Sequence, residues 1–164
     1  MIDQHIETLS IKSQELTPLL AQVLEGGGQF KLLVTGDSMS PFLGHLRDSV
    51  ILKEASGHKL KRGDIVLIRR RESDRYVLHR IIKMKPDGFI MNGDAQNWDE
   101  FVPFEQVVAV VSKIERKGRL ISCDSRGYRF LSWLWMLLRP FRGLLFKVIG
   151  VLAVIRRKIK PSKK

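Results

Sequence analysis

Cysteine is nearly absent from this chain of 164 residues. The single cysteine, Cys123, excludes a framework of internal disulfides and a cysteine-rich zinc site. Residues 1–4 contain neither a basic stretch nor an early apolar run, so we expect no signal peptide. With 44% hydrophobic and 28% charged residues, the chain is too apolar for a disordered protein, and we expect a globular body.

Acidic residues are missing from the last forty residues. All 17 Asp and Glu residues lie in residues 1–124, together with 18 of the 29 Lys and Arg residues, so this part has a net charge of +1. Residues 125–164 contain the other 11 basic residues and carry almost the whole formal charge of +12. We therefore divide the chain into an N-terminal helix (1–28), a β-rich domain (29–124) and a basic, hydrophobic tail (125–164).

The tail lacks an apolar run of the roughly 20 residues that a spanning helix needs, because Arg139, Pro140 and Lys147 interrupt it. Wound as a helix from Pro140, it has apolar residues on one face and Lys and Arg on the other. This pattern is typical of a cationic helix in an anionic membrane interface, with Trp133 and Trp135 as anchors. The alternative is a helix packed on the protein's own core. We expect association with the cytoplasmic membrane, with the basic end of the tail on the cytoplasmic side.

The rest of the chain indicates a mainly β body after a short helix. Leucine and valine residues at helical spacing over 16–24 are followed by three glycines at 26–28, which end the helix. Beyond them, short β-rich runs alternate with turn sequences, and no long helix separates them, which favours an all-β coiled-sheet or barrel-like body over a parallel α/β sheet. The predicted strands are Phe30–Thr35, Ser49–Lys53, Asp64–Arg69, Tyr76–Met84, Gly88–Asn92 and Val107–Arg116.

Three motifs in the body are candidates for chemistry. Residues 35–41 read Thr-Gly-Asp-Ser-Met-Ser-Pro, a tight turn that can present Ser38 with its N–H free to hold an oxyanion. In the strand over 76–84, His79 shares a face with apolar residues, where desolvation would keep it neutral and able to accept a proton. In the loop over 92–100, Asp94 or Asp99 could orient that histidine. Each motif has an ordinary structural interpretation too: a turn, a core histidine and turn acids.

Together, these motifs resemble the successive sequence boxes of the type I signal peptidases. The series is Gly36-Asp37-Ser38-Met39-Ser40-Pro41, Arg47-Asp48-Ser49-Val50, Lys61-Arg62-Gly63-Asp64-Ile65-Val66, His79-Arg80, and Gly93-Asp94 with Asp99. A histidine at position 79 is similar to the archaeal and endoplasmic-reticulum branch of the family. The Asp-Ser-Met core is also similar to the LexA-type self-cleaving repressors, which share the fold.

The resemblance implies a serine endopeptidase that cleaves a precursor or leader peptide near a membrane. Ser38 would be the nucleophile, His79 the general base, and Asp99 or, second, Asp94 the acid that supports it. Met39 would line the substrate groove. The family commonly has Ser or Thr where this chain has Gly36. The resemblance implies no metal and no cofactor, and it makes residues 29–124 the peptidase domain.

Two other functions remain open. One is a LexA-like protein that cuts itself, although the segment before Phe30 is short for the DNA-binding domain that such proteins carry. The other is a non-catalytic basic module that binds lipid or nucleic acid. We expect no nucleic-acid partner, because the body is almost neutral and the charge lies in the tail.

Overall fold

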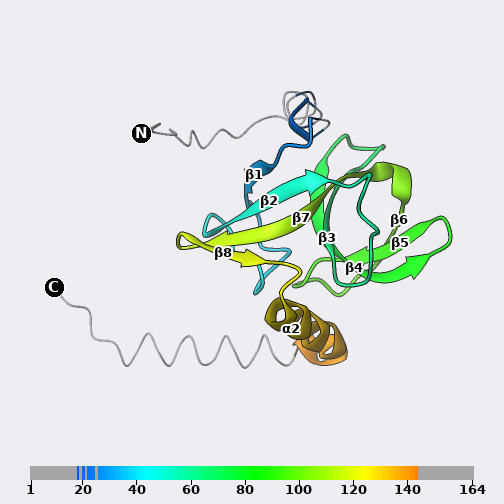
Figure 1. Ribbon diagram of the computed structural model, residues 1–164. Coiled ribbons are helices and arrows are strands. Elements are labelled where there is room, and N and C mark those ends of the chain that lie inside the picture. The colour runs from blue at the N-terminus through cyan, green and yellow to red at the C-terminus, as the bar shows by residue number, and fades with distance from the viewer. Residues whose placement is uncertain (1–17, 19, 21, 25, 144–164) are drawn as a thin grey trace.

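The structure is a computed structural model that describes residues 18, 20, 22–24 and 26–143. It contains one antiparallel sheet of eight strands, which confirms the predicted mainly β body (Figure 1). The strands are β1 (Phe30–Leu33), β2 (Asp48–Glu54), β3 (Ile65–Arg69), β4 (Tyr76–Lys85), β5 (Gly88–Asn92), β6 (Glu100–Pro103), β7 (Val107–Arg116) and β8 (Arg119–Ser122). They pair in the order β1-β2-β7-β3-β4-β5-β6, and β8 pairs with β7 outside this path.

All six predicted strands are present, within a few residues of their predicted ends. The strands β6 and β8, which are both four residues long, were not predicted from the sequence. All four residues of β8 are exposed, so it has no buried face to produce an apolar pattern. A two-residue turn joins it to β7, in which Lys117 and Gly118 both have positive φ, as tight hairpins favour.

Two hydrophobic clusters cover opposite faces of the central strand. In β3, Ile65 and Leu67 belong to one cluster, whereas Val66 and Ile68 belong to the other. Successive side chains of a strand point to opposite faces, so β3 is buried on both. Register shifts within three strand pairs bend the sheet and allow it to enclose both clusters.

The predicted N-terminal helix packs on this body. Residues 18, 20 and 22–24 are helical, and the buried side chains of Leu20 and Leu24 join the cluster around β2 and β3. Gly27, with a φ of +71°, ends the helix as predicted. Leu16 and Leu19 lie outside the described residues.

A helix follows the sheet, α2 (Arg126–Leu137), and it lies at the bottom of Figure 1. Ser125 caps its first turn by accepting a hydrogen bond from the backbone N–H of Tyr128. A single 3-10 turn, η2 (Arg139–Phe141), comes next and contains Pro140. The amphipathic pattern predicted beyond Pro140 falls mostly on residues 144–164, outside the described residues. Among the residues that are described, no helix is both long and apolar enough to cross a membrane.

Candidate active site

The turn that carries Ser38 is held open by its neighbours. Gly36 has a φ of +93°, a conformation that favours glycine, and its N–H donates to Nδ1 of His45 at 2.8 Å. The N–H of Ser40 donates to the carbonyl of Asp37 at 3.0 Å. Ser38 is half-buried, and within the described chain neither its hydroxyl nor its N–H has a hydrogen-bond partner. The turn therefore leaves both groups of Ser38 available.

A buried carboxylate anchors the other end of this loop. Asp48, the first residue of β2, is fully buried and accepts hydrogen bonds from the backbone N–H of Gly44 and from the guanidinium groups of Arg47 and Arg116. Burial alone would raise the pKa of Asp48, but these hydrogen bonds lower it well below its usual range. The carboxylate thus stays ionised and fixes the loop between β1 and β2.

The loop after β5 contacts the serine turn directly. The N–H of Ala95 donates to the carbonyl of Ser38 at 2.8 Å. A Cβ added to Gly93 would lie 2.7 Å from that carbonyl oxygen and 2.6 Å from Oε1 of Gln96, so only glycine fits at this position. The predicted serine motif and the predicted acid motif are therefore neighbours, and Gly93 allows their close approach.

His79 is buried in β4, as its apolar neighbours in the sequence predicted. Its side chain is 3% exposed, and burial lowers its pKa from 6.5 to about 4. The positive charge of Arg70 lowers it further, whereas the carboxylate of Asp94 acts in the opposite direction. Among the described residues, the Nδ1 atom of His79 has no hydrogen-bond partner, and the ring packs edge-on against half-exposed Trp98, with 5.9 Å between centroids. The imidazole is thus neutral at physiological pH, with an unused nitrogen.

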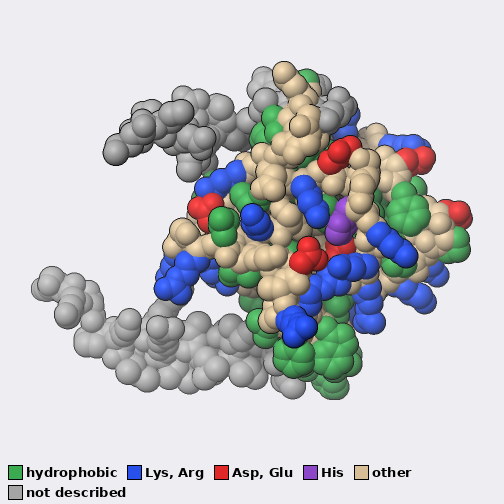
Figure 2. Space-filling view, in the orientation of Figure 1, with side chains coloured by type: hydrophobic (Ala, Val, Ile, Leu, Met, Phe, Trp, Pro, Cys, Tyr) green, Lys and Arg blue, Asp and Glu red, His purple; other side chains and the backbone are tan. Residues whose placement is uncertain are grey.

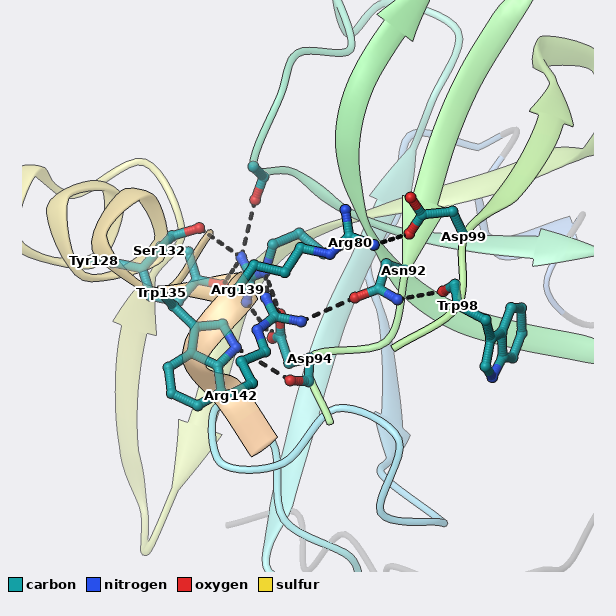
Figure 3. Close-up of polar contacts among 11 residues, drawn as sticks. Arg80, Asn92, Asp94, Trp98, Asp99, Tyr128, Ser132, Trp135, Arg139 and Arg142 are labelled. Atoms are coloured by element: carbon teal, nitrogen blue, oxygen red, sulfur yellow. Dashed lines mark hydrogen bonds and ion pairs between the residues drawn. The ribbon is translucent and has the colours of Figure 1, made fainter. Parts of the chain in front are cut away.

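Neither candidate acid hydrogen-bonds the histidine. Asp94 is buried and forms an ion pair with Arg80, with 2.6 Å between Oδ2 and Nη2 (Figure 3). Asp99 pairs with Arg139 instead. The charge of Asp94 raises the pKa of His79, which favours Asp94 over Asp99 as the supporting charge. The catalytic roles of both acids stay predictions.

The inner face of α2 completes the surroundings of Arg80, which adjoins His79 in β4. Nη1 of Arg80 donates to Oγ of Ser132 at 2.7 Å, to the Tyr128 hydroxyl at 3.2 Å and to the carbonyl of Gly63 at 3.0 Å (Figure 3). Burial opposes ionisation of Arg80, but Asp94 and Tyr128 outweigh it and raise its pKa. Arg80 is therefore a buried cation whose donors are shared between the acid loop and α2.

Two side chains, those of Trp135 and Met39, lie elsewhere than their sequence context predicts. Trp135 is buried, and its indole N–H donates to the carbonyl of Asp94 at 3.2 Å, so it is not the interfacial anchor that we predicted. Met39 is 2% exposed and belongs to the cluster that contains Leu24 and Leu43. In this structure Met39 packs in the core beneath Ser38, and its role in a substrate groove stays a prediction.

Several residues that shape the site were not predicted to belong to it. His45 accepts a hydrogen bond from the serine turn, and Ser132 accepts one from Arg80. Trp98 packs against the ring of His79, and the charge of Arg70 lowers the pKa of His79. His45 follows the serine motif closely and Trp98 lies within the acid motif, so both could have been proposed as site residues. Arg70 and Ser132 had no such signal, because only the folded chain brings them there.

The loop that contains Asp94 thus hydrogen-bonds the turn of Ser38 through Ala95, and its buried carboxylate acts electrostatically on the neutral, buried His79. Such groups can support nucleophilic catalysis with a general base. Within the described residues, no group of three or more His, Cys, Asp or Glu side chains could hold a metal ion. No protein-family model matches this chain, and neither does any curated protein.

Proposed function

We propose that this protein is a serine endopeptidase, similar to the type I signal peptidases, that cleaves a precursor or leader peptide near a membrane. The observation that carries the proposal is the loop over residues 93–97. It hydrogen-bonds the turn of Ser38 through Ala95, and its Asp94 carboxylate acts on the pKa of His79. The candidate nucleophile and base, 41 positions apart in the sequence, thus share a neighbour in the fold.

Two strand edges that no other strand of the described residues covers support a peptide substrate. β1 and β6 are the two ends of the main strand path. β1 runs into the turn of Ser38, and β6 begins two residues after Trp98, which contacts His79. An extended peptide could add to such an edge through main-chain hydrogen bonds, with its scissile bond beside Ser38.

In the proposed reaction, Oγ of Ser38 attacks the carbonyl carbon of the scissile peptide bond and gives its proton to His79. The N–H of Ser38, which donates to no other group of the described residues, helps to hold the oxyanion that forms. His79 then passes the proton to the leaving amine, and an acyl-enzyme ester remains on Ser38. A water molecule, deprotonated by His79, hydrolyses this ester and restores the free serine.

The experiment compares wild-type protein with Ser38→Ala and His79→Gln on a peptide library made from a digested proteome. New amino termini are identified by mass spectrometry, with anionic vesicles present. We expect cleavage beside small residues by the wild type and at least a thousandfold slower cleavage by both variants.

Ser40→Ala is the matched control, since it removes a neighbouring hydroxyl from the same turn, and it should cleave like the wild type. Circular dichroism of each variant checks that it is folded. Undiminished cleavage by both Ser38→Ala and His79→Gln would show that the proposal is wrong. Cleavage of the chain itself, with no cleavage of the library, would instead indicate the LexA-like alternative.

A further inference from the structure

The two faces of α2 have opposite characters. On its inner face, the hydroxyls of Ser132 and Tyr128 accept hydrogen bonds from Arg80. The indole N–H of Trp135, on the same face, donates to the carbonyl of Asp94. Its outer face consists mostly of large apolar side chains. In an ordinary surface helix the apolar stripe faces the protein and the polar residues face water. The outer face of α2 therefore needs an explanation.

The outer face is broadly exposed. Its large apolar side chains, together with the one that ends η2, are at least half exposed: Phe130 58%, Leu131 55%, Trp133 50%, Leu137 56% and Phe141 59%. Phe130 and Trp133 lie one turn apart, with 5.9 Å between their ring centroids. Figure 2 shows hydrophobic side chains gathered over α2 at the bottom of the view. We call these five residues the α2 apolar face.

The segment of sequence that contains this face carries charge of a single sign, although within the described residues Arg129 pairs with Asp64 and Arg139 with Asp99. From residue 125 to the end of the chain there are 11 Lys and Arg residues and no Asp or Glu. Aromatic side chains beside an excess of basic residues suit the boundary between the headgroups and acyl chains of an anionic bilayer. We propose that the α2 apolar face docks on an anionic lipid surface, with Phe130 and Trp133 inserted among the lipids.

A second copy of the chain fits this face less well. A symmetric dimer would place the same patch of two copies in contact. The two segments, each with 11 basic residues and no acidic residue from position 125 on, would then meet, and the carboxylates of Asp64 and Asp99 offset only two of those charges in each copy. An anionic bilayer supplies the missing negative charge.

This docking would bring the proposed peptidase site to the membrane, because the same helix contacts the lipid with one face and Arg80 with the other. The inference takes the proposed function as its setting, but its observations concern α2 and not Ser38. The two proposals can therefore fail separately.

The test is flotation of the full chain with vesicles of phosphatidylcholine containing phosphatidylglycerol. We expect wild-type protein and Ser38→Ala to float equally, and both to float far less with pure phosphatidylcholine. The double variant Phe130→Ser/Trp133→Ser should bind at least about tenfold more weakly, since two large apolar side chains no longer enter the bilayer. Phe101→Ser is the matched control, because it removes a phenylalanine of similar exposure (52%) from β6.

A second measurement locates the indole of Trp133. Lipids with brominated acyl chains should quench tryptophan emission from wild-type protein, and Trp133→Phe should lose most of this quenching while still floating. The inference is wrong if the double variant floats like the wild type. It is also wrong if sedimentation velocity shows a dimer that the same substitutions dissociate, because the face would then belong to a second copy.

Discussion

At the scale of single residues, His79 is the least ordinary side chain in the molecule. The imidazole of His79 is 3% exposed and is acted on by the positive charge of Arg70, and both effects make its protonation unfavourable. Asp94 offsets only part of this cost, because Arg80 already neutralises its carboxylate. The same surroundings that keep His79 available as a base also make the folded protein sensitive to acid.

The first prediction concerns this sensitivity. The pKa of His79 is about 4 in the folded protein and 6.5 in the unfolded chain. Between these values the unfolded chain binds a proton that the folded protein does not, so the free energy of unfolding rises with pH in this window. As the pH falls from about 6.5 to 4, His79 should remove about 3 kcal/mol of stability.

Urea unfolding of wild-type protein and of His79→Gln, at pH values from 4 to 7, measures the effect. The wild type should lose stability more steeply than the variant as the pH falls, because only the wild type has the imidazole. Two parallel curves would contradict the prediction. In the proposed reaction, the acid limb of the rate should likewise lie near pH 4.

At the scale of secondary-structure elements, α2 is the part of the tail that belongs to the body. Tyr128, Ser132 and Trp135 are spaced so that they share one side of the helix, and all three are buried. Two of them accept hydrogen bonds from Nη1 of fully buried Arg80, and the one other acceptor of Nη1 among the described residues is the carbonyl of Gly63. The helix is thus held by buried hydrogen bonds as well as by apolar contact.

A second prediction follows from removing one of these hydrogen bonds. Ser132→Ala takes the 2.7 Å acceptor from Nη1 of Arg80 and leaves a charged donor less well satisfied, so it should destabilise the protein by about 1–3 kcal/mol. Ser56→Ala is the matched control, because Ser56 is exposed and should change the stability by less than about 0.5 kcal/mol. Urea unfolding at pH 7 measures both, and equal costs for the two variants would contradict the role of Ser132.

The elements show which features a sequence can reveal. The strands β3, β4 and β7 were predictable because runs of apolar and β-branched residues end at recognisable turns. The burial of His79 followed from the apolar residues that share its face. The exposed strand β8 carried no pattern, and the inner face of α2 could not be identified, since its polar residues have partners more than forty positions away.

At the scale of the whole molecule, Asp94 lies where three parts of the chain meet. Its carboxylate pairs with Arg80 of β4, and its carbonyl accepts from Trp135 of α2. The next residue, Ala95, binds the carbonyl of Ser38 in the loop between β1 and β2. Local motifs predicted the serine turn and the acid loop separately, but the ion pair that joins them to α2 depends on the tertiary fold.

The last prediction tests this junction with Asp94→Asn. The substitution keeps the shape of the side chain but leaves the charge of Arg80 buried without its partner, so the variant should lose about 3–5 kcal/mol of stability. Asp74→Asn is the matched control, because Asp74 pairs with Arg69 at the exposed end of the β3–β4 hairpin, so the substitution should leave the melting temperature unchanged.

Hydrogen exchange followed by mass spectrometry then shows which backbone amides lose protection in Asp94→Asn. Amides of α2 and of the Ser38 turn should lose protection together in Asp94→Asn. If only the loop over residues 93–97 were affected, the three parts would be stabilised independently and Asp94 would not join them.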